Sequence, residues 1–124
     1  MLAECPLVAF AAVSDLERAR SFYGGRLGLR LISEQPPFAL VFDAHGTTLR
    51  VTAVAKLTPA AYTVLGWHVP NTAEAVESLR AAGVTFEHFE GLHQDEAGIW
   101  TAPGGVRVAW FKDPDGNVLS VSEG

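Results

Sequence analysis

The sequence contains a single cysteine, Cys5, which precedes Pro6 near the start of the chain. One thiol cannot form an internal disulfide, so a reducing, cytoplasmic compartment is the simpler expectation. A nucleophilic role for Cys5 is not favoured either, because the residue lies at the frayed end of the chain.

Clusters of positive charge and long hydrophobic runs are missing as well. The 9 Lys and Arg residues are outnumbered by 14 Asp and Glu residues, which gives a formal net charge of −5, and both signs are scattered along the chain. Neither a nucleic acid nor an anionic membrane is therefore an expected partner. The longest apolar stretches are broken by Pro, Gly or charge well short of a membrane span. Glu4 stands where a secretory signal would carry a base, so no signal peptide is expected.

The composition that is present suits one small globular domain over residues 1–124. Hydrophobic residues make up 48% of the chain and charged residues 19%, which is enough apolar material to fill a core. A chain of 124 residues is too short for two independent domains of usual size.

The first half of the chain has the pattern of a strand, a capped helix and three further strands. Ser14 can cap the helix, and Glu17 follows three residues later. Apolar residues then recur at helical spacing as far as Tyr23. The expected elements are a strand over 7–13, a helix over 15–26 and strands over 29–33, 38–43 and 47–54.

The second half repeats this order. Asn71 is placed to cap a helix that Gly83 would end, and the segment Asp113-Pro114-Asp115-Gly116 predicts a tight turn between two strands. The expected elements are a strand over 62–69, a helix over 72–82 and strands over 84–89, 106–111 and 117–121.

The repeat predicts an α+β fold of two βαβββ modules, over about 7–54 and 62–123. A helix can cover only one face of each sheet, and the other face must meet its counterpart or enclose something. Curved mixed sheets around a cleft are the natural outcome, and the cleft is where a function is expected.

Two segments resemble the signatures of a known family. The first runs from Val13 to Tyr23 and is followed by Leu27-Gly28-Leu29, and the second is the stretch from Trp110 to Asn117. Together with the repeat they resemble the glyoxalase/bleomycin resistance/dioxygenase (vicinal oxygen chelate) superfamily over nearly the whole chain. The resemblance implies the paired-module fold, a cleft for a small molecule and a homodimer. Exposed strand edges in such a fold favour a dimer as well.

Metal-dependent members of that family hold a divalent ion with four His, Glu or Gln side chains on strands that face the cleft. The resemblance places these four positions at Val8, Arg50 (or Val51, if the register shifts by one), Val64 and Ser120. The valines have no donor atom, arginine is a cation, and serine is a poor ligand. No metal and no other cofactor is therefore expected.

The same positions identify the side chains that share the cleft, because alternate residues of a strand point to one face. Arg50 could bind a ligand carboxylate, or it could pair with an acid of the protein or snorkel at the sheet edge. His68 could transfer protons or be a satisfied histidine near the end of its strand. Trp110 could stack on a ligand ring or pack in the core. The candidate ligand-binding residues are Phe10, Arg50, Thr52, His68, Trp110 and Ser120.

The polar and glycine-rich segment over 90–105 leaves other questions open. Trp100 lies among glycines that would permit a mobile flap, and its direction is not determined by the pattern. His93, Asp95 and Glu96 could bind a metal, although such short polar clusters are usually solvated surface.

Three functions are consistent with these residues. The leading expectation is a metal-free protein that binds a small organic ligand, anionic or aromatic. An enzyme with lyase, isomerase or dioxygenase-type activity, with or without a metal, is the first alternative, and no catalytic residue is assigned. An interaction module with a vestigial cleft is the second. A fold that hosts many activities does not choose among them.

Overall fold

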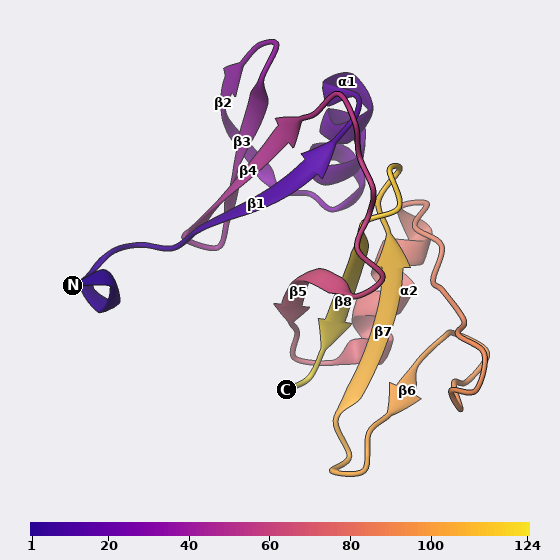
Figure 1. Ribbon diagram of the computed structural model, residues 1–124. Coiled ribbons are helices and arrows are strands. Elements are labelled where there is room, and N and C mark those ends of the chain that lie inside the picture. The colour runs from indigo at the N-terminus through magenta and orange to yellow at the C-terminus, as the bar shows by residue number, and fades with distance from the viewer. The chain divides into compact units, whose positions relative to one another are not determined.

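The computed structural model describes all residues from 1 to 124, in two compact units over Met1–Thr58 and Pro59–Gly124 (Figure 1). Each unit contains one four-stranded mixed sheet. The α+β class and the paired modules of the sequence prediction are confirmed, while the single domain over 1–124 stays a prediction.

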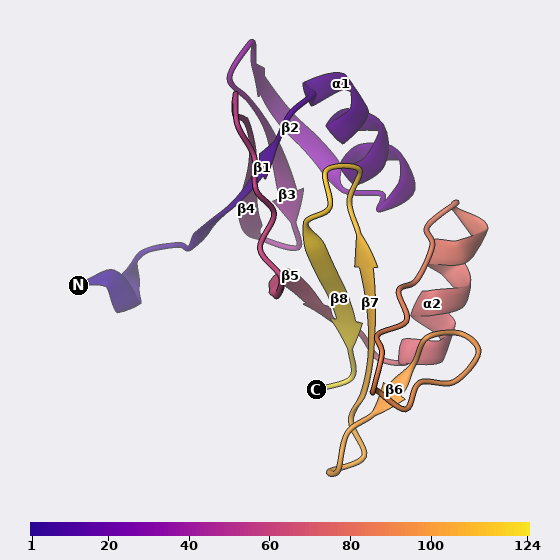
Figure 2. The same cartoon turned by 45° about the vertical axis from the view of Figure 1, so that its right-hand side comes forward.

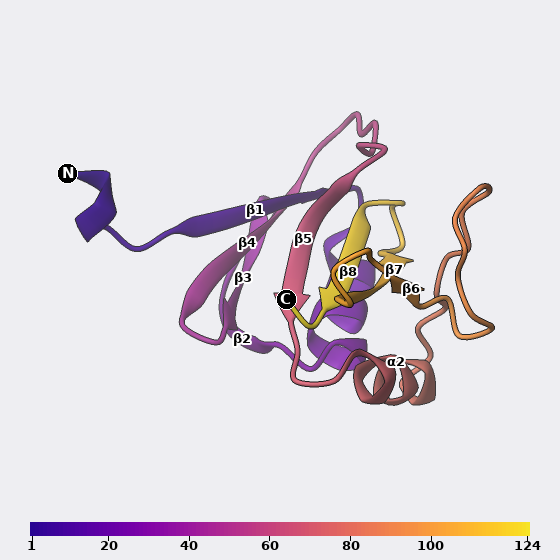
Figure 3. The ribbon, with the colours of Figure 1, turned by 90° about the horizontal axis from the view of Figure 1, so that it is seen from below.

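The first unit is a sheet in the order β1-β4-β3-β2, in which β1 runs parallel to β4 and the other neighbours are antiparallel. The N-terminal residues before β1 lead away from this sheet in all three views (Figure 3). The elements are the short 3-10 turn η1 (Leu2–Glu4), β1 (Val8–Val13), α1 (Leu16–Ala19), the π-helical segment η2 (Arg20–Arg26), β2 (Arg30–Gln35), β3 (Ala39–Ala44) and β4 (Thr47–Ala53).

The helical segment of this unit begins one residue later than a Ser14 cap would place it. Asp15 is the cap, because its carboxylate accepts a hydrogen bond from Arg18 N at 3.0 Å. The Ser14 hydroxyl instead accepts a bond from the Arg18 guanidinium at 2.8 Å. The helix widens into π geometry, as the bond from Leu27 N to Phe22 O shows, and it ends before Gly28, which has a positive φ of 74°.

The second unit is a sheet in the order β5-β8-β7-β6, in which β5 runs parallel to β8. Figure 2 shows α2 along one side of β7 and β8. The elements are β5 (Thr63–His68), α2 (Thr72–Ala81), β6 (Trp100–Thr101), β7 (Arg107–Lys112) and β8 (Val118–Ser122). Asn71 caps α2 as predicted, since its side chain accepts a bond from Glu74 N at 3.0 Å.

The strand predicted over 84–89 is wrong. Phe86 forms only an isolated bridge to Phe111, and the edge of the sheet beside β7 is occupied by the two-residue strand β6. The physical reason is the Gln94 side chain, whose amide accepts a bond from Phe89 N and donates to the carbonyl oxygens of Glu87 and Gly98. These bonds turn the chain into a closed loop where a longer strand would have continued.

The core of each unit lies between its sheet and its helical segment. In the first unit the Tyr23 ring, which is fully buried, lies 6.2 Å from the ring of Phe42. In the second, Phe111 is 1% exposed and contacts the rings of Trp67 and Phe86. No helix in the structure is long and apolar enough to cross a bilayer.

The start of α2 is joined to the end of β8 by a charged network. The Glu123 carboxylate accepts a bond from Thr72 N at 3.0 Å and two bonds from the Arg107 guanidinium at 2.5 and 3.1 Å. The Thr72 hydroxyl in turn donates to Arg107 O at 2.9 Å. The hydrogen bonds from Arg107 and from the Thr72 amide lower the pKa of Glu123 below its ordinary value.

Glu123→Gln is therefore expected to lower the thermal unfolding midpoint near neutral pH. A carboxyl with a lowered folded-state pKa stabilises the protein above its unfolded pKa, about 4.5, and this contribution is lost as the pH falls through the folded-state value. The difference between wild type and variant should therefore shrink in acid, as melting curves at about pH 7 and about pH 3 would measure. Glu77→Gln, an exposed change on α2, is the control. A difference of equal size at both pH values would contradict the assigned role.

Candidate functional site

Each sheet has one face turned away from its helical segment, and we call it the open face of that unit. In the first unit, Phe42 contacts the helix and pairs with Leu49, so the alternation of β4 turns its neighbour Arg50 to the open face. Arg50 pairs with Phe10 of β1 and with Val41 of β3. The predicted association of Phe10 with Arg50 therefore appears in the sheet register.

Arg50 is half-buried on the inner strand β4. Its guanidinium donates a hydrogen bond to Gln35 Oε1, and no carboxylate lies within ion-pair distance of it. Other arginines of this unit do have acidic partners: Arg20 pairs with Glu34, and Arg30 lies 3.7 Å from Asp43. The structure therefore does not contain the internal ion pair that was one alternative role for Arg50.

Thr52 lies two residues further along β4, on the same face, between Ala12 and Ala39. Its Oγ1 atom is buried and has no hydrogen-bond partner. A buried hydroxyl without a partner is uncommon and calls for a physical explanation, such as a group that the isolated chain lacks. Arg50 and Thr52 thus provide donors with unused capacity on one face of one strand.

In the second unit, burial distinguishes the two faces at the centre of β7 and β8. Ala109, Phe111 and Leu119 are buried under the helix side, while Trp110 and Ser120 are half-exposed on the open face. Trp110 pairs directly with Ser120, which pairs with Gly66 of β5. A Cβ atom at position 66 would lie 2.9 Å from Ser120 Oγ, so the serine hydroxyl occupies the space that the missing side chain leaves.

Three aromatic side chains lie together on this open face, and we call them the aromatic row. The Trp110 ring lies 6.1 Å from that of Trp100 and 5.6 Å from that of Phe89. Sequence reasoning did not identify Phe89 and left the direction of Trp100 open. Trp100 could have been placed by recognising the hairpin, because Gly105 N bonds to Ala102 O in a tight turn that pairs Trp100 with Val108.

His68 lies near the end of β5 and is exposed. Its Nε2 atom is 3.0 Å from the backbone oxygen of Glu123. A carbonyl oxygen can only accept, so Nε2 is the donor in this contact. The contact is that of a hydrogen-bonded histidine near the end of a strand.

The four positions at which the family resemblance would place metal ligands are distributed over both units. Val8 belongs to the open face of the first unit with Arg50, and Ser120 to that of the second; Val64 lies at an irregularity in the pairing of β5 with β8. Val51, the alternative to Arg50, is fully buried on the helix side. Neither unit brings three His, Cys, Asp or Glu side chains together, so these residues do not fit a divalent ion.

A cavity of about 530 Å³ adjoins the aromatic row. Trp100, His93 and Asp95 line it, while Glu96 lines a different cavity. The Asp95 carboxylate accepts hydrogen bonds from Ala97 N and Ile99 N at 2.9 and 2.8 Å. Asp95 therefore has a structural role in forming this loop.

A family model described as the glyoxalase/bleomycin resistance protein/dioxygenase superfamily matches residues 7–121. Solved structures similar to this chain include a lactoylglutathione lyase from Agrobacterium tumefaciens, with 19% identity, a TM-score of 0.73 and coverage of 98% of this chain and 94% of that one. Another is the fosfomycin resistance protein FosX from Listeria monocytogenes, with 17% identity, a TM-score of 0.74 and coverage of 100% and 93%.

A superfamily member from Sphaerobacter thermophilus is 22% identical, with a TM-score of 0.72 and coverage of 98% of both chains. No curated protein matches the sequence. The structural likenesses, all below 25% identity, concern the fold. The family match covers nearly all of the chain, and the chain therefore belongs to the glyoxalase/bleomycin resistance protein/dioxygenase superfamily.

Proposed function

We propose that this protein binds a small organic anion with an aromatic part, without the help of a metal ion. The observation that carries the proposal is Arg50, a half-buried guanidinium on an open sheet face whose one hydrogen-bond partner is the neutral Gln35 amide. A half-buried cation has lost part of its contact with water, and an anionic partner would compensate for that loss. A ligand carboxylate would supply that partner.

The neighbours of Arg50 suit the rest of such a ligand. Phe10, its direct partner on β1, is 62% exposed and offers an apolar surface for a ring. The Thr52 hydroxyl, on the same face of β4, has no partner within the protein and is a second donor on this strand. An arginine fork can hold a carboxylate by two parallel charge-assisted bonds. Together these residues match an aromatic carboxylate better than a neutral or cationic molecule.

The aromatic row supports the same class of ligand from the second unit. Trp110 and Trp100 are only half-buried and Phe89 is 39% exposed, so part of their ring surface is accessible. Accessible tryptophan faces bind flat organic molecules by stacking. The row is a ring-binding surface in its own right, and His68 and Ser120 add polar groups to that face.

Two further predictions remain part of the proposal. Metal-independent binding follows from the lack of donors at Val8, Arg50 and Val64, and this also disfavours a metal-dependent enzyme. The homodimer implied by the family stays a prediction; β1 and β5 each end a sheet and so have one unpaired edge for such contacts.

The proposal is tested by comparing 2-naphthoate with 2-naphthamide, which keeps the ring system but lacks the charge. Calorimetry on the wild-type protein with EDTA present should give a dissociation constant about tenfold lower or better for the carboxylate, because only it can pair with Arg50. Equal affinity for both molecules, or carboxylate binding that disappears with EDTA, would contradict the proposal.

A further inference from the structure

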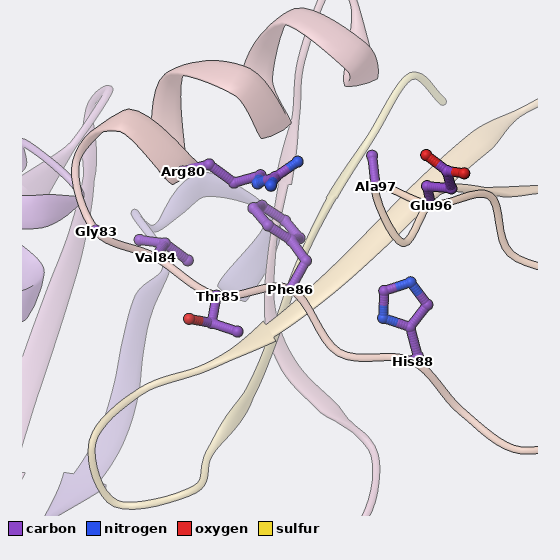
Figure 4. A pocket seen from close by; sticks show the side chains of 8 residues that line it. All are labelled: Arg80, Gly83, Val84, Thr85, Phe86, His88, Glu96 and Ala97. Carbon is purple, nitrogen blue, oxygen red and sulfur yellow. The ribbon is translucent and has the colours of Figure 1, made fainter.

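A second cavity lies on the helix side of the second unit, and we call it the α2 pocket. It has a volume of about 490 Å³ and is lined by the end of α2 and by the loop after it, including Arg80, Val84, Phe86, His88, Glu96 and Ala97 (Figure 4). The Phe86 ring contacts that of Phe111 at 5.5 Å. Phe111 points to the opposite face from Trp110, so the α2 pocket is distinct from the open face.

The loop that forms one wall of the pocket is held by side-chain bonds. The side-chain amide of Gln94 makes three hydrogen bonds within the loop, of 2.7 to 2.9 Å, with Phe89 N, Glu87 O and Gly98 O. Gly98 has a φ of 90°, and a Cβ atom there would lie 3.3 Å from Phe86 Cβ. Glycine thus allows the loop to pack directly against the pocket floor, and the pocket is formed before any ligand binds.

The charged side chains of this pocket are exposed to solvent, while the loop beside them is held in place. Figure 4 shows Arg80 on the α2 side and Glu96 on the loop side, with His88 nearer to Glu96. Neither Arg80 nor Glu96 has an ion-pair partner in the structure, in contrast to the nearby pair of Lys112 and Glu87 at 3.7 Å. Opposite charges therefore face one cavity without neutralising each other.

Hydrogen-bond donors lie on the α2 side of the pocket, and acceptors lie on its loop side. Arg80 can only donate, so it suits a carboxylate. His88 Nε2 lies 3.2 Å from the backbone oxygen of Asp95 and donates to it, so in the neutral ring Nδ1 is an acceptor. Glu96 is also an acceptor, so this side suits an ammonium group. Val84 and Phe86, which are 5% and 7% exposed, form an apolar floor for a short carbon chain.

We infer that the α2 pocket binds a small zwitterion that carries one carboxylate and one ammonium group, as an amino acid does. The carboxylate pairs with Arg80, the ammonium group pairs with Glu96 and bonds to His88, and the carbon chain lies on the floor. This site goes beyond the anion site proposed at Arg50. It uses different residues on the other face of a different sheet.

The test is an NMR titration of the ¹⁵N-labelled protein with L-alanine and 4-aminobutyrate, two zwitterions with different charge spacing. At least one should shift the amide signals around residues 80–88 and 95–98 with a dissociation constant below about 10 mM. Butyrate and butylamine, which each carry a single charge, should bind about twofold to fivefold more weakly. No shifts from either zwitterion at about 20 mM, or equal binding of the singly charged molecules, would overturn the inference.

Two variants test whether Arg80 and Glu96 bind the two charged groups of the zwitterion. Arg80→Gln and Glu96→Gln should each weaken zwitterion binding about twofold to fivefold, because both side chains are exposed, and neither removes an interaction that holds the fold. Glu74→Gln is the matched control, because Glu74 is an exposed acid of α2 that does not line this pocket. Unchanged affinity in both pocket variants would overturn the assignment. Binding of 2-naphthoate should be the same in Arg80→Gln as in wild type, so the two proposals fail independently.

Discussion

Replacing Arg50 with Met is expected to weaken the binding of 2-naphthoate about thirtyfold, because removal of one partner of a half-buried charge pair typically costs about 2 kcal/mol or more. Met retains much of the volume of the arginine stem and removes its charge. The Gln35 amide loses a hydrogen bond in the variant, but it is exposed and can bond to water. Calorimetry on both proteins would measure the difference.

Arg30→Met is the matched control for this experiment. Arg30 belongs to the same sheet, but its side chain is 74% exposed and pairs with Asp43. An exposed ion pair contributes little, so the control should change the affinity less than about twofold. A loss of under about threefold in Arg50→Met, or an equal loss in both variants, would place Arg50 in a structural role.

Phe111→Ala is expected to destabilise the second unit by about 3–5 kcal/mol, the usual cost of truncating a buried aromatic ring. Phe111 is 1% exposed, and its ring lies 6.5 Å from that of Trp67 and 5.5 Å from that of Phe86. The truncation leaves a cavity between β7, β5 and the bridge at Phe86. Urea unfolding monitored by tryptophan fluorescence would measure this loss of stability, since all three tryptophans belong to this unit.

Phe89→Ala provides the comparison, because it removes the same ring from a position that is 39% exposed. The expected cost is about 1 kcal/mol or less. If the two variants lost equal stability, the core would not be centred on Phe111. A loss of stability below about 1 kcal/mol for Phe111→Ala would also show that the core is not centred on Phe111.

The parts of the fold that were predicted from the sequence are those that depend on local periodicity. The resemblance left Arg50 and Val51 as alternatives for one position, and the structure places them on opposite faces of β4, because successive side chains of a strand face opposite ways. The turn at 113–116 was predicted from its residues, and the Asp113 carboxylate does accept bonds from Asp115 N and Asn117 N. Asp113 is only 4% exposed. This burial depends on tertiary packing, and no local pattern in the sequence predicts it.

The parts that were not predicted depend on contacts between side chains and distant backbone. The segment over 84–89 has the alternation of a strand, but the Gln94 amide holds it in a loop, and no sequence periodicity reports such a bond. Strand β6 has two residues, which is too short for any period to be visible. The aromatic row was missed for this reason, since Trp100 joins Trp110 only through that pairing.

The most direct test of the proposed function combines both changes, on the ligand and on the protein, in one thermodynamic cycle. Calorimetry would measure 2-naphthoate and 2-naphthamide against wild type and Arg50→Met. The account predicts a loss of about thirtyfold for the carboxylate and less than about twofold for the amide, because only the carboxylate can interact with the charge. Equal losses for both ligands, or no binding of 2-naphthoate to the wild-type protein, would contradict it.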